Sequence, residues 1–200
     1  KGSWMFSARR SFLDLLVDAI GTGVAPRYSD YQGKFTLNLS ERSSITVLGI
    51  LGVDDIKFDR ETAIEDGDDQ YGTSHNIETA AGLNWFYLWS DKGYSNTSFS
   101  FLHTRYENDF QKTVTEKDDI KTDAWETAVT MRNVNHYSFN HSHRIRFGGE
   151  AKWLSSNYNM FRAGYIDLLG NPKPNYYYNN DMSSQKYAAF ADYNMTLFLR

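Results

Sequence analysis

Hydrophobic and polar residues alternate along much of this chain, most clearly in residues 143–154, HRIRFGGEAKWL. Every second residue of this segment lies on the same side of an extended chain, and one side carries Ile145, Phe147, Gly149, Ala151 and Trp153. The other side carries Arg144, Arg146, Gly148, Glu150 and Lys152. Because successive side chains of a β-strand point to opposite faces, the segment predicts a strand with one apolar and one charged face. A soluble half-buried strand and a strand of an outer-membrane barrel both fit, since water or a wet lumen can meet the charged side.

The same alternation recurs in seven other segments, so the sequence predicts eight strands. These segments are residues 1–10, 34–40, 43–52, 78–90, 95–104, 127–139 and 186–200. The alternation in residues 127–139 is less clean, and the sequence leaves their facing open. Several segments exceed the roughly five or six residues of an ordinary strand. The expected fold class is therefore all-β, with antiparallel up-and-down strands.

The connections between these strands differ in length in a regular way. Three are short, at residues 40–44, 90–93 and 139–143, and four are long, at residues 11–27, 57–73, 108–122 and 157–183. Short and long connections alternate along the chain. Outer-membrane barrels have short periplasmic turns and long extracellular loops, whereas soluble sandwiches have no reason to sort loop length by end. The pattern therefore favours a transmembrane antiparallel β-barrel segment.

Aromatic residues gather beside the short connections. They are Tyr87, Trp89, Tyr94, Tyr137 and Phe139. An aromatic belt at a membrane–water boundary places such residues there, although an aromatic core at the strand ends is the alternative. No other part of the sequence resembles a layer that could cover so many apolar faces. We therefore expect the apolar side of residues 143–154 to face lipid, and the following side chains to face the lumen: Arg144, Arg146, Glu150 and Lys152.

The amino-acid composition argues against several kinds of binding site and structural element. The chain has 200 residues, a formal net charge of −4 and no long basic run, which argues against nucleic acid. It has no cysteine, so it can form neither disulfides nor a thiolate metal site. No apolar run reaches the roughly 18 residues that a transmembrane helix needs. An aromatic share of 16%, with only 3 Pro, suits a chain of many half-buried strands.

Three short motifs near the start resemble a known family. They are Ser7-Ala8-Arg9-Arg10-Ser11-Phe12-Leu13-Asp14, residues 28–34 from Tyr28 to Lys34, and residues 39–43 from Leu39 to Ser43. A strand that ends in such an arginine pair, a return strand and a serine-rich turn resemble the barrel of TonB-dependent outer-membrane receptors, of the type found in Bacteroidetes. The resemblance covers about the first 55 residues well and the rest loosely.

The resemblance implies energy-coupled import of a scarce nutrient across the outer membrane of a Gram-negative bacterium. The nutrient would be an iron chelate, a cobalamin, or an oligosaccharide or peptide. We expect residues 1–200 to be one segment of a larger barrel without the plug domain. The implied partners are outer-membrane lipid, the TonB complex through other parts of the receptor, and a surface lipoprotein. The alternatives are a complete eight-stranded barrel with a structural or adhesion role, and a soluble all-β binding module.

Residues that could carry other chemistry have plainer explanations. His141 and His143 fall at a predicted turn, which favours exposed histidines over a metal site. The acidic stretch around Asp66, Asp68 and Asp69 lacks the spacing of a calcium-binding loop. Asp54, Asp55 and His75 form no recognised catalytic motif. We therefore expect no enzymatic activity, no metal and no cofactor.

The predicted connection 157–183 is the best candidate for contact with a ligand. Its aromatic rings could stack on sugars or aromatic chelators, and its arginine could hold an anionic group. Packing of the loop on itself or on a partner is an equal alternative. The candidate ligand-binding residues are Tyr158, Phe161, Arg162, Tyr165, Tyr176, Tyr177 and Tyr178.

Overall fold

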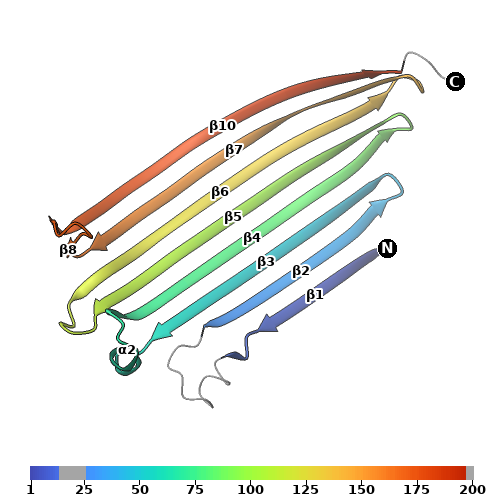
Figure 1. Ribbon diagram of the computed structural model, residues 1–200. Coiled ribbons are helices and arrows are strands. Elements are labelled where there is room, and N and C mark those ends of the chain that lie inside the picture. The colour runs from blue at the N-terminus through green and yellow to red at the C-terminus, as the bar shows by residue number, and fades with distance from the viewer. Residues whose placement is uncertain (14–25, 197–200) are drawn as a thin grey trace.

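A single antiparallel sheet of eight strands makes up most of the molecule (Figure 1). The computed structural model describes residues 1–13 and 26–196. The strands follow one another across the sheet in the order β1-β2-β3-β4-β5-β6-β7-β10. They are β1 Gly2–Arg10, β2 Arg27–Ser40, β3 Ser43–Phe58, β4 Gln70–Ser90, β5 Gly93–Lys112, β6 Asp118–Ser138, β7 His143–Arg162 and β10 Tyr176–Met195.

Two small elements lie in the connections at one end of the sheet. The helix α2 (Arg60–Asp66) joins β3 to β4 and ends at Gly67, whose φ of 76° is one that glycine adopts readily. A two-residue ladder of β8 (Tyr165–Ile166) and β9 (Pro172–Lys173) joins β7 to β10. Arg60 ties the first of these connections to the β5–β6 turn, because its guanidinium lies 2.9 Å from the Glu116 carboxylate.

The eight predicted strands and the three short turns are confirmed, but the predicted long connections are too long. The connection predicted at 108–122 contracts to residues 113–117, and the one at 157–183 contracts to residues 163–175. The strands β4 to β7 and β10 each have 20 or 21 residues. The predicted connection at 11–27 and the end of the last predicted strand lie largely outside the described residues.

The pairing register brings the apolar side of every strand to the same face of the sheet. One continuous row of paired residues runs through Trp4, Phe35, Val47, Leu83, Phe99, Met131, Ala151 and Tyr187. We call the face that bears this row the apolar face. The opposite face, which bears Arg132, Arg146, Glu150 and Lys152, is the polar face. The alternation predicted from the sequence is thus confirmed, including the shared face of the four charged residues of β7.

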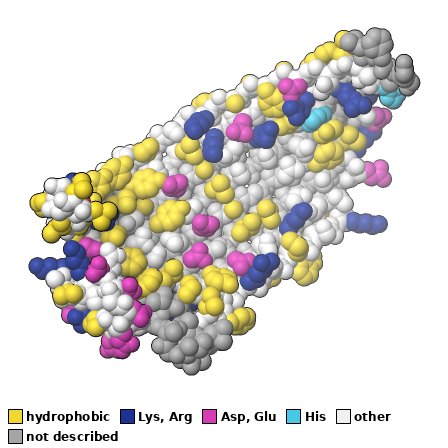
Figure 2. Space-filling model, viewed as in Figure 1, with side chains coloured by type: hydrophobic (Ala, Val, Ile, Leu, Met, Phe, Trp, Pro, Cys, Tyr) yellow, Lys and Arg dark blue, Asp and Glu magenta, His cyan; other side chains and the backbone are white. Residues whose placement is uncertain are grey.

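No second layer covers the sheet in the part of the chain that the structure describes. Among the described residues only Ala63 and Ala124 are buried hydrophobic side chains, and many large apolar side chains are exposed, including Trp4 at 78% and Phe99 at 49%. Figure 2 shows one face, where Lys, Arg, Asp and Glu side chains are spread along the whole length among hydrophobic groups. Large exposed apolar surfaces commonly mark sites of contact with an apolar phase or with a partner.

The two edges of the sheet do not meet. β1 pairs with β2 and β10 pairs with β7, so these strands form opposite edges of an open sheet (Figure 1). Within residues 1–13 and 26–196, no helix is long and apolar enough to cross a membrane.

Aromatic rings on the apolar face pack against one another beside the short turns. The rings of Trp89 and Tyr137 stack at 5.4 Å with an interplanar angle of 9°, and Phe139 meets Tyr137 edge-on at 5.0 Å. The Trp89 ring reaches this position by lying across Gly93, where a Cβ atom would overlap it. Gly93 therefore leaves room for the ring that completes the stack.

Replacing Gly93 with alanine should lower the free energy of unfolding by about 1 kcal/mol, because the Trp89 ring must move off Tyr137 and an aromatic pair is lost. Gly49→Ala is the matched control, since a Cβ atom at Gly49 meets nothing within 4 Å. Its effect should stay within about 0.5 kcal/mol. Urea titration of both variants measures the difference, and an equal effect of the two would contradict the role given to Gly93.

Candidate functional site

The line of short turns crosses the strands obliquely. In the paired row, Val47 is four residues from Ser43, Phe99 is six from Gly93, and Ala151 is eight from His143, each of which begins its strand after a turn. The offset therefore grows by one residue per strand. With a rise of about 3.3 Å per residue and about 4.8 Å between strands, the strands lean by about 35° from the perpendicular to the line of turns.

In β3, β5 and β7, the strands that follow the short turns, charged or amide side chains begin on the apolar face at a similar distance from the turn. Asp55 lies twelve residues from Ser43, Arg105 twelve from Gly93, and Asn157 fourteen from His143. Between the turns and these groups, most side chains on the apolar face are apolar over a band of about ten residues, with Asn133, Asn135 and His103 among the exceptions. At the lean given above, the band is about 27 Å wide when measured perpendicular to the line of turns. We call this region the apolar band.

Ion pairs link charged side chains along and across the strands directly beyond the apolar band. The Arg105 guanidinium lies 2.6 Å from the Glu107 carboxylate and 3.4 Å from that of Asp123. His75 and Asp55 are hydrogen-bonded across β3 and β4. These side chains are 36–58% exposed, so each pair contributes little to stability. Their arrangement instead marks the boundary at which this face becomes compatible with water.

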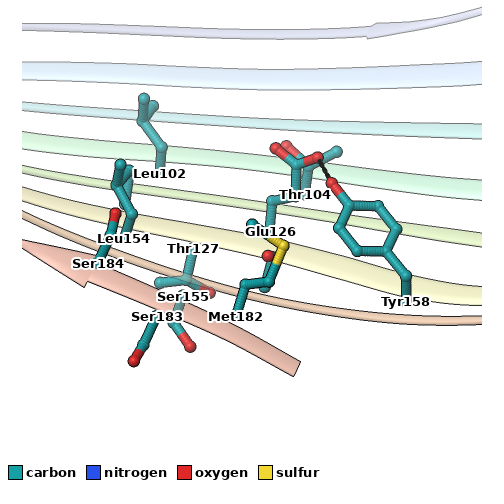
Figure 3. A pocket seen from close by; sticks show the side chains of 12 residues that line it. Leu102, Thr104, Glu126, Thr127, Leu154, Ser155, Tyr158, Met182, Ser183 and Ser184 are labelled. Carbon is teal, nitrogen blue, oxygen red and sulfur yellow. Dashed lines mark hydrogen bonds between the residues drawn. The ribbon is translucent and has the colours of Figure 1, made fainter. Parts of the chain in front are cut away.

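The polar face contains a hollow of about 330 Å³, in the half of the sheet away from the short turns (Figure 3). We call it the Tyr158 hollow, because the Tyr158 hydroxyl donates a hydrogen bond to the Glu126 carboxylate at its border. Thr127, Ser155 and Ser183 extend from the other side of the strands in the same view. The residues that line the hollow on the polar face are Leu102, Thr104, Glu126, Ala128, Leu154, Ser156, Tyr158, Met182 and Ser184.

The candidate ligand residues are divided between the two faces. The register places Tyr158, Arg162, Tyr176 and Tyr178 on the polar face, and Phe161 and Tyr177 on the apolar face. Only Tyr165 lies in the connection, where its ring is 4.6 Å from the Arg162 guanidinium carbon. The prediction that all seven lie in a loop is therefore wrong. The polar-face members are drawn together, with ring centroids 6.4 Å apart both for Tyr158–Tyr178 and for Tyr176–Tyr178.

Three further residues beside these aromatics were missed by the sequence analysis. Glu126 accepts the Tyr158 hydrogen bond, the Asn180 amide donates to the Tyr178 hydroxyl at 2.9 Å, and Tyr106 occupies the polar face on β5. Tyr106 and Glu126 precede Tyr158 by 52 and 32 residues in the sequence, whereas Asn180 is only two residues from Tyr178. The signal that would have found Tyr106 and Glu126 is the strand register, which links Tyr106 to Ala124 and Ala124 to Tyr158.

The other candidate groups form no catalytic or metal-binding arrangement. Asp55 meets His75, but Asp54 points to the opposite face. His143 lies by the third turn, with its Nδ1 atom 2.5 Å from the Tyr193 hydroxyl. In the part of the chain that the structure describes, no group of three or more His, Cys, Asp or Glu side chains could hold a metal ion.

A second hollow, of about 900 Å³, lies on the polar face near the short turns. Its border includes Arg144 and the ion pair of Arg146 with Asp192. The imidazole of His136 stacks on Tyr94 at 4.5 Å on the same border. Two of the four residues predicted to face a lumen, Arg144 and Arg146, therefore border this concave part of the polar face together with aromatic groups.

The β8–β9 connection is held closed by one carboxylate. Asp167 accepts backbone hydrogen bonds from Asn171 at 2.8 Å and Leu169 at 3.0 Å, and lies 3.2 Å from the Lys173 ammonium. The hydrogen bond from the Asn171 backbone, with smaller contributions from Lys173 and Leu169, lowers the pKa of Asp167 below its usual 3.8. The ionised form is therefore the one that the folded connection favours.

A lowered pKa means that this stabilisation is complete above about pH 4 and is lost as the pH falls through the lowered value. Amide hydrogen exchange at Leu169 and Asn171 should therefore be slow at neutral pH and should lose its protection in acid. Asp167→Asn should show weaker protection that does not depend on pH in this range. Equal protection of the variant and the native chain at neutral pH would contradict the assignment.

Two comparisons with known proteins found no match. No protein-family model matches the sequence, and no curated protein matches it.

Proposed function

We propose that this chain forms part of the wall of a transmembrane β-barrel in the outer membrane of a Gram-negative bacterium. The apolar face lies against lipid and the polar face lines the lumen. The observation that carries this proposal is the apolar band, whose two borders run parallel to each other and oblique to the strands. A lipid slab imposes parallel borders of this kind on the outside of a barrel.

The dimensions of the band support the proposal. Transmembrane barrels have strands tilted by roughly 35–45° and an outward apolar band about 25 Å tall. The lean of about 35° and the width of about 27 Å, both obtained from the register, agree with these values. The stacked aromatic rings of Trp89 and Tyr137 lie at the turn-side border, where barrels carry an aromatic girdle.

A soluble sheet satisfies these observations less well. It would need a second layer to cover the apolar face, and the only helix with described bounds has 7 residues. In lipid, by contrast, the same face requires no covering element, and the ion pairs beyond the band meet water. The hydrogen-bonding groups at both edges must be satisfied in a membrane, so the proposal requires further strands between β10 and β1. This requirement favours a larger barrel over a complete eight-stranded one.

The finer proposal is that the barrel belongs to a TonB-dependent importer of a scarce nutrient. Its support is the resemblance of residues 7–14, 28–34 and 39–43 to that family. The Tyr158 hollow and the neighbouring tyrosines give the lumen a surface suited to stacking on a cargo. Coupling to TonB, and any contact with a surface lipoprotein, would involve other parts of the receptor.

An arginine placed on either face near the middle of the band tests the proposed facing. Phe99→Arg puts the charge on the apolar face and should destabilise the protein folded in lipid vesicles by roughly 2–4 kcal/mol. Ser100→Arg, one residue away on the polar face, should cost less than about 1 kcal/mol because its side chain meets the wet lumen. Urea titration in vesicles measures the free energy of unfolding of both variants. Equal losses would contradict the proposal that the chain forms part of a barrel wall.

Cargo recognition is tested with two pairs of aromatic residues on opposite faces. Replacing Tyr158 and Tyr178 with alanine in the full receptor should reduce uptake at limiting concentration about tenfold, since two lost stacking contacts amount to about 1.4 kcal/mol or more. Phe161 and Tyr177 form the control pair, with ring centroids 4.9 Å apart on the apolar face.

The control double alanine variant should leave uptake unchanged. The readout is growth on a ferric chelate, cobalamin or an oligosaccharide as the limiting nutrient, with surface expression measured in parallel. Uptake that is unaffected by the Tyr158 and Tyr178 changes would remove these tyrosines from the cargo path.

A further inference from the structure

Two lysines lie opposite each other on the polar face, next to the Tyr158 hollow on the side of the short turns. Lys152 on β7 and Lys186 on β10 are register partners on the polar face, so their side chains leave the sheet side by side. Like charges placed directly opposite in a sheet repel each other and destabilise it. In the described part of the chain, neither lysine has an ion-pair or hydrogen-bond partner.

The neighbouring charges on this face do not relieve the repulsion. The nearest acid along β7 is Glu150, which lies 3.9 Å from Arg132, and Asp192 on β10 is taken by Arg146. Other charged groups nearby on the polar face thus have partners, while the two opposed lysines are left with solvent. Their side chains are half-buried for Lys152 and exposed for Lys186, so both ammonium groups can reach a solute.

The lysines are continuous with the hollow. Leu154 and Ser184, which line it, are the next polar-face residues after Lys152 and before Lys186 along their strands and are themselves register partners. One step along a strand face covers about 7 Å. The hollow therefore offers an apolar floor of Leu102 and Leu154 with two ammonium groups at one end, while Glu126 at the other end is occupied by Tyr158.

We propose that the Tyr158 hollow and the Lys152–Lys186 pair form one subsite for an anionic cargo with an apolar or aromatic body. Carboxylate or phosphate groups of the cargo lie between the two ammonium groups, and its body lies on Leu154 and against Tyr158. The bound anion removes the repulsion between the lysines, so binding gains from a charge arrangement that the empty sheet leaves unbalanced. This assignment rests on the proposed function, in which the polar face lines the path of the cargo.

The test uses full-length protein in a zwitterionic detergent and benzene-1,3,5-tricarboxylate as the probe, with benzene-1,3,5-trimethanol as its neutral counterpart. Isothermal titration calorimetry should show binding of the tricarboxylate that weakens with added salt, and much weaker binding of the triol. Lys152→Gln with Lys186→Gln should weaken tricarboxylate binding at least tenfold. Lys34→Gln is the matched control, because Lys34 is a polar-face lysine on β2, far across the sheet from the hollow.

Unchanged affinity in the double glutamine variant would overturn the subsite, and so would equal losses in that variant and in Lys34→Gln. A double variant that unfolds more easily but binds the probe normally would also overturn it, because the lysines would then pair with an adjoining strand of the barrel. The anion-binding test and the test of lipid facing can succeed or fail independently. Salt-sensitive anion binding can persist even if arginine at positions 99 and 100 proves equally costly, and lipid facing can hold even if no anion binds.

Discussion

Cross-strand hydrogen bonding is the interaction on which every other feature of this molecule depends. The sheet is one layer thick, and the described residues bury almost no hydrophobic side chain, so no core organises the strands. The cross-strand hydrogen bonds alone align the strands, of which the five longest have 20 or 21 residues. Because side chains alternate from face to face, a shift of one residue in any pairing would exchange the apolar and polar faces of that strand. The turns that set each pairing therefore determine the chemistry of both surfaces.

The same register also determines how the surfaces are divided along their length. The one-residue offset per strand makes the line of turns oblique, and the change from apolar to charged side chains follows the same slope. The apolar stretches of β3, β5 and β7 thus end at a similar level, although these strands lie far apart in the sequence. Such agreement among independent strands is the main reason for favouring a lipid environment over a protein partner. A partner surface would need to match only the local shape of the sheet.

The parts of this structure that the sequence predicted are those where the two faces differ most. Val47, Leu83 and Phe99 alternate with polar neighbours, which revealed both the strands and their facing. Beyond the band the contrast disappears, because Asn157, Asn159 and Asp181 on one face are as polar as residues on the other. The strands there were mistaken for a loop for that reason. The contacts of Tyr158 with Glu126 and the pairing of Lys152 with Lys186 depend on register, which no local pattern contains.

The length of the strands has a consequence for the mouth of the proposed barrel. About a third of each long strand continues past the apolar band, so in the proposed barrel the wall would rise above the membrane as a hydrogen-bonded collar before any connection begins. Tyr158, Arg162 and Tyr178 are mounted on this collar and lose little conformational freedom when a solute arrives. A flexible loop would have to be ordered first. In the proposed barrel, the collar would form a vestibule of fixed aperture, in which selection by size precedes selection by contact.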